Sequence, residues 1–356
     1  MKFEPIPKEI TLRSLVSAKS SQTLLEFLVQ KFKYLTREEW EERIVSGKVK
    51  VNDREASAGQ PLRAGDEVAY TTNSWEEPAV KTDYRIVFED DHLLIVSKPA
   101  PLPVHAIGAY FRNTLTQLLR RDRPEAQGYH LVHRLDSETS GLLALVKDAK
   151  YLKGLQKQWS HSNLKPSPLA GEGRVRGEPP VVKTYRAIVF GRFPQGKRVV
   201  DAPIGKKEGS LVRMKLAVVQ SQKNSTTQPV VSQVEPLAVN GSDAKASVTE
   251  FELLEGKQSF SLIQAKPLTG RTHQIRVHLE HLGFPIVGDK LYSGDDETFL
   301  HFYENDWDEW LEKRVLLPRA ALHAFKLEFP HPVTGERLVF EDSLPGDLAR
   351  FWESVP

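Results

Sequence analysis

The apolar residues near the start of the chain follow first a helical and then a strand-like pattern. Apolar side chains recur at helical spacing at Leu25, Leu28, Val29 and Phe32. Thr36 and Glu39 match a capping box, which predicts a second helix that ends at Gly47. Lysine and valine alternate over residues 48–51, which predicts a strand, and a turn follows at residues 52–53. We therefore expect a small α/β module, which we assign to residues 1–75.

The rest of the chain alternates short apolar runs with turns. Strands are predicted at residues 85–89, 93–97, 184–190, 248–254, 260–265 and 324–329. Helices are predicted around residues 115–119, 152–159, 272–282 and 348–352, with Thr272 as the cap of the third and Gly283 as its stop. Because strands outnumber helices and the turn spacing suits antiparallel pairing, residues 76–356 are expected to form an α+β domain. Its core would be a mainly antiparallel mixed sheet with flanking helices.

Two segments interrupt this second domain. Residues 161–182 are rich in proline, glycine and arginine, and residues 219–246 are rich in glutamine, serine, threonine and asparagine. Such compositions bury too little apolar surface to offset the entropy of ordering. We therefore predict that both segments are exposed, flexible insertions.

Composition excludes several classes of protein. The formal net charge is only +2, so charge alone does not identify a nucleic-acid binder. The chain has no cysteine, which excludes disulfides, thiolate metal sites and cysteine nucleophiles. Its apolar runs are shorter than the ~20 residues that a membrane helix needs. We expect a soluble, cytoplasmic protein with no membrane partner, and a monomer is the default.

The candidate chemistry centres on residues 133–141, where Asp136 follows a basic pair and precedes a small polar turn. An apolar strand-like segment begins immediately afterwards. A carboxylate on a loop that is held by the next strand can act as a nucleophile or a base. A second segment, residues 270–279, contributes Arg271 and Arg276 as candidate cations, and an arginine beside a carboxylate keeps that carboxylate ionised. The two segments together predict a site built on an ion pair.

These segments also carry a resemblance. The motifs that match are found at residues 98–99, 103–105, 133–141, 183–185, 270–279, 322–324 and 329–332. As a set and in this order, they resemble the RluA family of pseudouridine synthases over most of residues 84–350. Residues 46–52 and 62–68, with the helix pair before them, resemble an αL-type RNA-binding module found in a small-subunit ribosomal protein. The departures are an acidic second helix in that module and Phe284 where the family often has histidine.

The resemblance implies roles for individual residues. Asp136 would be the catalytic carboxylate, Tyr185 would stack on the target uracil, and Arg276 would pair with the aspartate. The residues implied in substrate binding are Arg134, His133, Lys98, Arg271, His273 and Gln274. The isomerisation needs an aromatic platform for an unstacked base and phosphate contacts, but no cofactor and no metal. The implied partner is RNA, with large-subunit ribosomal RNA first and transfer RNA second.

Other functions remain as alternatives. His278 with His281, and His130 with His133, have a spacing of three that could suit a metal, but a clear acidic third ligand is missing. Asp136 with Glu138 could suggest a glycosidase pair, but residues two positions apart rarely set the separation that such a pair requires. Ser140 does not lie in a Gly-x-Ser-x-Gly elbow, which disfavours a serine hydrolase. The main rival is a catalytically inactive RNA-binding or ribosome-assembly protein. Because Asp136, Tyr185 and Arg276 are all present, the enzyme is favoured.

Overall fold

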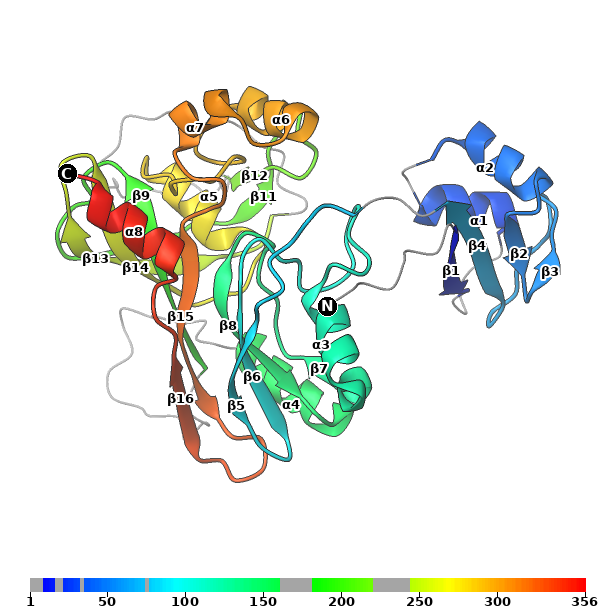
Figure 1. The fold of residues 1–356 in the computed structure, drawn as a ribbon, viewed down its shortest axis with the longest axis horizontal. Coiled ribbons are helices and arrows are strands. Elements are labelled where there is room, and N and C mark those ends of the chain that lie inside the picture. Colours follow the sequence, from blue (N-terminus) through cyan, green and yellow to red (C-terminus); the bar gives the residue numbers. More distant parts are fainter. Residues whose placement is uncertain (1–8, 17–21, 33–34, 74–76, 161–180, 220–243) are drawn as a thin grey trace, which may run out of the picture. The chain divides into compact units, whose positions relative to one another are not determined.

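The computed structural model describes residues 9–16, 22–32, 35–73, 77–160, 181–219 and 244–356. The chain divides into two compact units, Met1–Glu76 and Glu77–Pro356, and each is described by itself (Figure 1). The two predicted flexible insertions, 161–182 and 219–246, lie outside the described residues except at their ends. The prediction of their flexibility therefore stays a prediction.

The smaller unit is a four-stranded antiparallel sheet with two helices. Its elements are β1 (Glu9–Leu15), α1 (Leu24–Lys31), α2 (Arg37–Val45), β2 (Val49–Val51), β3 (Arg54–Glu55) and β4 (Glu67–Asn73), and the strand order is β1-β4-β2-β3. The predicted capping box of α2 is present, because Thr36 accepts from the backbone of Glu39 and the Glu39 side chain accepts from Thr36. Trp40 is fully buried in the core of this unit. Strand β1, which the sequence pattern did not predict, pairs with β4 along its whole length.

The larger unit is built on a mainly antiparallel mixed sheet, as the sequence predicted, and this sheet has ten strands among the described residues. Its strands are β5 (Arg85–Glu89), β6 (Leu93–Lys98), β7 (His130–Leu131), β8 (Ser140–Val146), β9 (Val182–Phe190), β10 (Lys197–Asp201), β13 (Val248–Gly256), β14 (Phe260–Pro267), β15 (Leu322–Pro330) and β16 (Arg337–Glu341). The main order is β10-β13-β14-β9-β15-β8-β6-β5, and β15 with β8 is the parallel pair. Strands β11 (Ile204–Lys206) and β12 (Leu216–Val218) form a separate hairpin.

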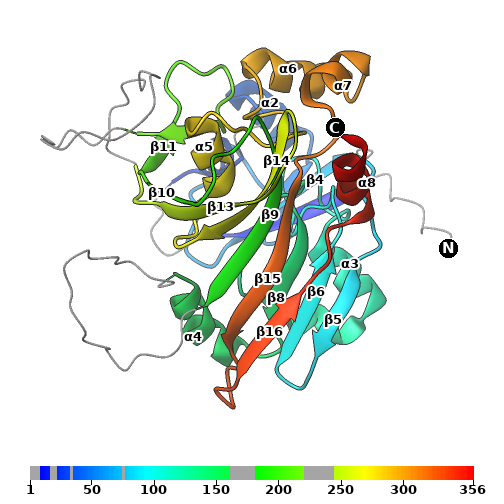
Figure 2. The ribbon, with the colours of Figure 1, turned by 90° about the vertical axis from the view of Figure 1, so that its left-hand side faces the viewer.

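Helices cover both faces of this sheet. They are α3 (Leu115–Asp122), α4 (Ala149–Ser160), α5 (Gln274–His281), α6 (Asp296–Asn305), α7 (Glu309–Val315) and α8 (Gly346–Ser354), with a 3-10 turn at Pro124–Gly128. Helix α3 packs on one face of β6 and β8, against Leu94 and Leu143, and α4 packs on the other, against Ile95 and Ala144 (Figure 2). Successive residues of β6 and β8 therefore pack into hydrophobic clusters on opposite faces of the sheet, which explains why the sequences of both strands are continuously apolar.

Strand β8 follows the Asp136 loop and lies at the centre of the sheet. All seven of its residues are buried. At its start, Gly141 has φ +111°, and a Cβ there would collide with the backbone of Ala324 on β15. Glycine is required at this position by both backbone conformation and space. The glycine that closes the 133–141 motif thus allows the parallel pairing of β8 with β15, which anchors the loop.

The prediction for the start of α5 was wrong. Thr272 does not cap the helix, because His273 takes the cap position in the left-handed region with φ 55° and no side-chain cap bond forms. Instead, the Gln274 side chain accepts from the backbone N–H of Arg271 at 3.0 Å. This side chain fixes the turn from inside the protein. Gly283, with φ +79°, follows the end of the helix as predicted.

Candidate active site

Asp136 lies on the loop between β7 and β8, and its carboxylate is partly open to solvent. Its Oδ2 accepts a hydrogen bond from Nη1 of Arg276 at 3.0 Å, and 33% of its side chain is exposed. The loop is closed locally by the Thr139 N–H, which donates to the Asp136 carbonyl at 3.1 Å. The two segments that the sequence proposed as partners, 140 residues apart, are therefore joined by an ion pair.

Arg276, on α5, is shared by two carboxylates. Besides Asp136, its Nε and Nη2 donate to Asp289 at 2.6 and 2.8 Å. Its guanidinium also lies 4.9 Å from the centre of the Tyr292 ring. Burial alone would lower the pKa of Arg276, but Asp289 and then Asp136 raise that pKa well above its ordinary value. The arginine is a permanent cation, held in one orientation.

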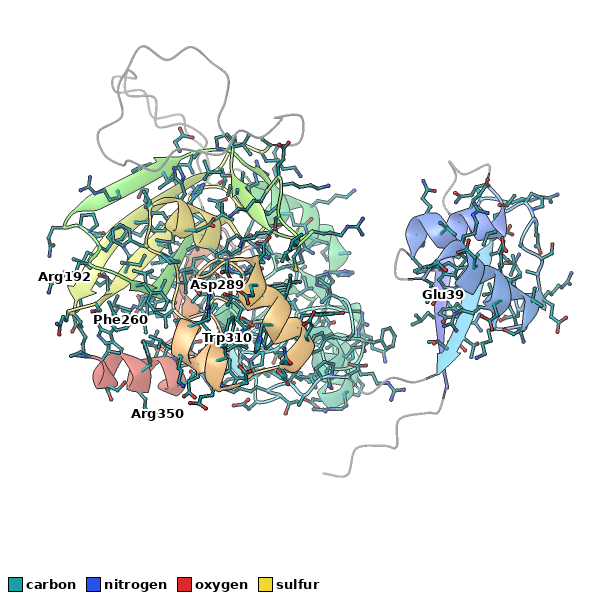
Figure 3. All side chains as sticks on the ribbon, turned by 90° about the horizontal axis from the view of Figure 1, so that it is seen from above. Glu39, Arg192, Phe260, Asp289, Trp310 and Arg350 are labelled. Carbon is teal, nitrogen blue, oxygen red and sulfur yellow. The ribbon has the colours of Figure 1, made fainter. Side chains whose placement is uncertain are left out.

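Asp289 is a site residue that the sequence analysis missed. It lies within the larger unit, where Figure 3 labels it. Its side chain is fully buried, and Oδ1 also accepts from the backbone N–H groups of Leu291 and Tyr292, both at 3.1 Å. Burial raises the pKa of Asp289, but Arg276 and these hydrogen bonds outweigh it and lower that pKa. Its only local signal is the preceding turn residue, Gly288. Nothing in such a short pattern distinguishes it from an ordinary turn aspartate.

Tyr185, on β9, lies where the Asp136 loop meets the core. It packs against two apolar clusters, one of which contains Leu135 and Ala324. Its hydroxyl makes no hydrogen bond to any residue that the structure describes. Burial, followed by the charge of Asp136, raises the pKa of this phenol. The side chain is therefore a neutral aromatic group beside an ionised carboxylate.

Two of the expected substrate-binding residues have internal partners. The Lys98 ammonium is fully buried and donates to the carbonyls of Pro99, Leu102 and Ser137 at 3.0, 2.8 and 3.1 Å. It therefore holds the residue that follows Asp136. Gln274 accepts from Thr269 and Arg271 and donates to Val248 and Thr249. These bonds use the hydrogen-bonding capacity of both side chains.

The two expected histidines differ in their distance from the ion pair. His273 brings Nε2 to 3.9 Å from Asp136 Oδ2, while its Nδ1 lies 2.9 Å from the Tyr292 hydroxyl. Burial and Arg276 lower the pKa of His273. His133 instead stacks on Trp159, with ring centres 5.1 Å apart, and accepts from the Ala144 N–H. Burial, followed by the charge of Lys183, lowers the pKa of His133 to about 3. Both rings are neutral near pH 7.

The two expected arginines outside the ion pair are exposed. Arg134 has Nη1 at 3.4 Å from Nε2 of His105, and Arg271 donates from Nε to the Ala246 carbonyl at 3.1 Å. Their remaining guanidinium N–H groups make no hydrogen bond to the described residues. They are available to an anionic ligand.

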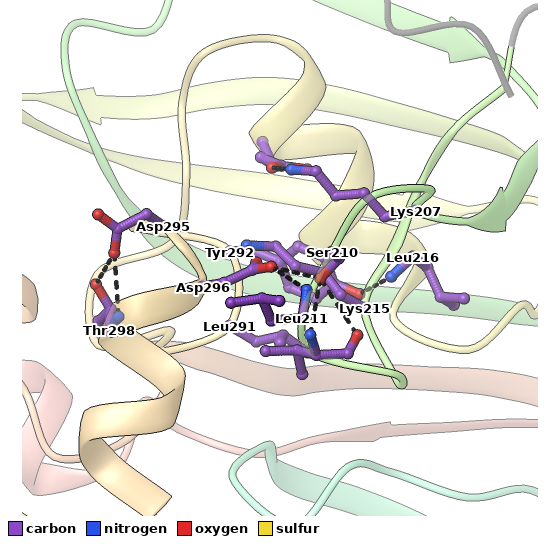
Figure 4. Close-up of polar contacts among 12 residues, drawn as sticks. Lys207, Ser210, Leu211, Lys215, Leu216, Leu291, Tyr292, Asp295, Asp296 and Thr298 are labelled. Carbon is purple, nitrogen blue, oxygen red and sulfur yellow. Dashed lines mark hydrogen bonds and ion pairs between the residues drawn. The ribbon is translucent and has the colours of Figure 1, made fainter.

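Further ion pairs hold the loop and its surroundings. Lys290 contacts Glu138 at 2.6 Å, and Arg319 donates to the Glu138 carbonyl at 3.4 Å. Beside Tyr292, Asp296 accepts from Ser210, Leu211 and Lys215, and this network fastens the turn of the β11–β12 hairpin to α6 (Figure 4). Burial raises the pKa of Asp296, but the bonds from Ser210 and Lys215 outweigh it and lower that pKa to about 2. These contacts hold the segments that lie around the ion pair of Asp136 with Arg276.

His278, one of the histidines whose spacing could have suggested a metal site, has other hydrogen-bond partners. His278 has Nδ1 at 2.9 Å from the Thr249 hydroxyl and Nε2 at 3.1 Å from the Ala202 carbonyl, so both ring nitrogens have partners. Among the described residues, no cluster of three or more histidine or carboxylate groups has metal-binding geometry. No described helix is long and apolar enough to cross a membrane.

The geometry defines what chemistry the site can perform. A partly exposed carboxylate is kept ionised by a buried arginine, and a neutral aromatic ring lies near it. Such a carboxylate can act as a nucleophile, and the ring offers a surface on which an unstacked base can lie. Because Arg276 is fixed by Asp289, the carboxylate does not have to reorganise its partner during a reaction.

The comparisons with known proteins agree with this geometry. Residues 92–281 match the RNA pseudouridylate synthase family, and residues 22–68 match the S4 domain. The chain is 32% identical over 317 residues to ribosomal large subunit pseudouridine synthase D of Nitrosomonas europaea, covering 86% of this chain and 76% of the relative. It is 30% identical over 275 residues to the mitochondrial tRNA pseudouridine(32) synthase of Saccharomyces cerevisiae, covering 77% of this chain and 51% of the relative.

A solved structure agrees as well. Human RNA pseudouridylate synthase domain containing 4 aligns with a TM-score of 0.53 and 26% identity, covering 75% of this chain and 91% of that one. The fold, the paired motifs and these matches lead to one assignment: the chain belongs to the RNA pseudouridylate synthase family and carries an S4 domain before its catalytic domain.

Proposed function

We propose that this protein isomerises uridines to pseudouridine in large-subunit ribosomal RNA, with Asp136 as the catalytic carboxylate. The observation that carries the proposal is the ion pair of Asp136 with Arg276, in which the carboxylate stays partly exposed. The other carboxylate that pairs with Arg276, Asp289, is fully buried, so Asp136 is the one of the two that a nucleotide can reach. The ribosomal target is supported by the relative from Nitrosomonas europaea, whose name states that substrate.

Each residue has a separate task in the reaction. The target uridine leaves its stack, and Tyr185 supports the uracil ring. An Asp136 carboxylate oxygen bonds to the nucleotide as the bond between N1 and C1′ breaks. The uracil turns within the site, C5 bonds to C1′, the C5 proton leaves and N1 gains a proton. The carboxylate is released unchanged, so the net reaction is an isomerisation that consumes no co-reactant.

Arg276 keeps Asp136 anionic until the attack. His273 and Tyr292 pack beside the ion pair and limit the space that water can occupy. Arg134 and Arg271, with free guanidinium N–H groups, contact the phosphates that position the strand. The S4 domain adds RNA contacts of its own and so raises the affinity of the catalytic domain for its substrate.

The experiment follows the proton that leaves C5. Ribosomal RNA carrying tritium at uridine C5 is incubated with the native protein, with Asp136→Asn and with Asp91→Asn. Asp91 is an exposed aspartate in the turn between β5 and β6, so its substitution is the matched control. We expect tritium release by the native protein and by Asp91→Asn, and none by Asp136→Asn. Equal release by Asp136→Asn would refute the assigned carboxylate.

The RNA target is tested by the same assay with purified fractions. Tritiated transfer RNA replaces ribosomal RNA, with all other conditions unchanged. Release from ribosomal RNA alone supports the proposed target. Release from transfer RNA alone would transfer the same chemistry to that substrate, in line with the yeast relative. Tight binding of ribosomal RNA without release from either fraction would instead indicate an inactive RNA-binding protein.

A further inference from the structure

Lys183 differs from the other nearly buried lysines of the described residues. It lies on β9, two residues before Tyr185, and is 7% exposed. Lys98 donates to three carbonyls, Lys215 pairs with Asp296, and Lys290 pairs with Glu138. Lys183, in contrast, makes no hydrogen bond or ion pair with any residue that the structure describes. Its charge therefore has no internal counter-charge among the described residues.

An unpaired ammonium in this position is costly. Lysine is rarely buried without a partner, because its charge loses hydration that nothing replaces. Burial lowers the pKa of Lys183 to about 8, and no carboxylate opposes that change. A fully buried side-chain nitrogen without a hydrogen-bond partner occurs elsewhere among the described residues, but not at Lys183. Because Lys183 Nζ has no partner, part of its surface must be exposed to solvent. The ammonium is thus an almost buried charge without an internal counter-charge, which a bound anion would supply.

Gly270 lies beside the Lys183 ammonium. A methyl group placed on Gly270 would lie 3.9 Å from Lys183 Nζ and would meet no other heavy atom within 4 Å. The backbone of Gly270 is outside the left-handed region, so neither strain nor crowding requires a glycine there. The missing side chain leaves the ammonium accessible. Arg271, the residue that follows Gly270, is an exposed cation.

We propose that Lys183, together with the exposed Arg271, binds a backbone phosphate of the RNA next to the target uridine. This inference rests on the proposed function and adds a phosphate site to it. Phosphate is the anion that every nucleotide carries, and a lysine binds it as a point charge. Lys183 is on the same strand as Tyr185 and acts electrostatically on His133, three residues before Asp136. The contact therefore falls beside the flipped nucleotide, where it fixes the strand in register.

The test measures how binding depends on salt. Full-length protein carrying Asp136→Asn, which binds without turnover, is titrated with a fluorescent transcript of large-subunit ribosomal RNA at several salt concentrations. Lys183→Met, Lys183→Arg, Gly270→Ala and Lys313→Met are each added to that background. Lys313 is an exposed lysine paired with Glu309 on helix α7, so it controls for the loss of any positive charge. Thermal unfolding of each variant is measured in parallel.

We expect Lys183→Met to weaken binding and to reduce the slope of log K against log salt by about 0.7 to 0.9, the value of one phosphate contact. Its Tm should rise, because an unpaired buried charge is replaced by an apolar side chain of similar length. Lys183→Arg should keep the slope, Gly270→Ala should weaken binding because its methyl group lies against the ammonium, and Lys313→Met should change neither quantity.

Two results would overturn the phosphate site. One is a salt slope that Lys183→Met leaves unchanged. The other is a lowered Tm with an equal loss of affinity at every salt concentration, which would make Lys183 a structural residue. Both are distinguishable from failure of the proposed function. If the native protein released no tritium from any RNA, the isomerase assignment would fail, whereas normal release with an unchanged slope would remove the Lys183 site alone.

Discussion

The two carboxylates that share Arg276 lie in contrasting surroundings. Asp289 is completely buried, accepts two hydrogen bonds from the guanidinium and two from backbone N–H groups, and has no contact with solvent. Asp136 is one-third exposed and accepts one bond from the same guanidinium. The buried carboxylate fixes the arginine, and the exposed one is left free to react. Arg276 thus connects Asp289, which stabilises the fold, with Asp136, which we propose as the reacting carboxylate.

This contrast makes separate predictions for stability and for activity. The cost of removing a buried charge partner is much larger than that of removing an exposed one. The expected changes in the free energy of unfolding should therefore decrease from Arg276 to Asp289, to Tyr292 and finally to Asp136. The expected loss of activity does not follow that order.

Arg276→Met should give the largest destabilisation. It leaves the Asp289 carboxylate buried without its cation, which costs about 3 to 5 kcal/mol. Urea unfolding monitored by tryptophan fluorescence measures this change. Arg314→Met is the matched control, because Arg314 pairs with Asp295 at the surface and its loss should cost less than about 1 kcal/mol. Equal effects of the two substitutions would show that Arg276 is not an internal anchor.

Asp289→Asn should destabilise the protein by about 1.5 to 3 kcal/mol, because the amide lacks the negative charge and its NH2 group cannot accept one of the two hydrogen bonds that Arg276 donates. The folded protein lowers the pKa of Asp289 below its ordinary value of 3.8. The stabilisation is therefore present above pH 3.8 and is lost as the pH falls through the lowered pKa. The variant lacks this contribution, so its stability should fall less steeply in acid than that of the native protein. Parallel acid unfolding curves would contradict this role of Asp289.

Tyr292→Phe should have a smaller effect. The substitution removes a hydroxyl that lies 2.9 Å from His273 Nδ1 and accepts from the Leu216 N–H, but it keeps the ring beneath the Arg276 guanidinium. A loss of about 0.5 to 1.5 kcal/mol is expected. Activity should decrease mainly through a lower kcat, because His273 would lose the partner that holds it beside Asp136. An unchanged kcat with a raised KM would instead assign the hydroxyl to RNA binding.

The sequence predicted the larger pattern of the fold because that pattern is local. Continuous apolar strands, the capping box at Thr36 and the stop at Gly283 depend on residues a few positions apart, and the structure confirms them. The sequence analysis missed strand β1 because β1 pairs with β4, whose residues lie more than 50 positions later in the chain. The prediction that Thr272 caps α5 was wrong because the buried side chain of Gln274 fixes the turn before this helix.

The site could be predicted only in part for the same reason. The resemblance selected Asp136 and Arg276, and the structure brings them together. It did not select Asp289, whose importance comes from a guanidinium that reaches it across the fold. It grouped Lys98 with the substrate-binding residues, although the ammonium is surrounded by carbonyls of its own chain. A motif states which residues occur together, but burial and partners separate those that face the substrate from those that hold the others.

Asp136→Asn gives the sharpest form of the comparison, because it should have the smallest effect on stability and the greatest on activity. One hydrogen bond to a partly exposed carboxylate is worth less than about 1 kcal/mol, and Arg276 remains fixed by Asp289 after its removal. Loss of the anionic carboxylate that attacks the nucleotide should reduce tritium release at least about a thousand-fold. The measurement pairs urea unfolding with the release assay on the same preparation. If Asp136→Asn destabilised the protein as much as Asp289→Asn, the two carboxylates would be equivalent structural partners of Arg276. The exposure of Asp136 would then have to be explained without catalysis.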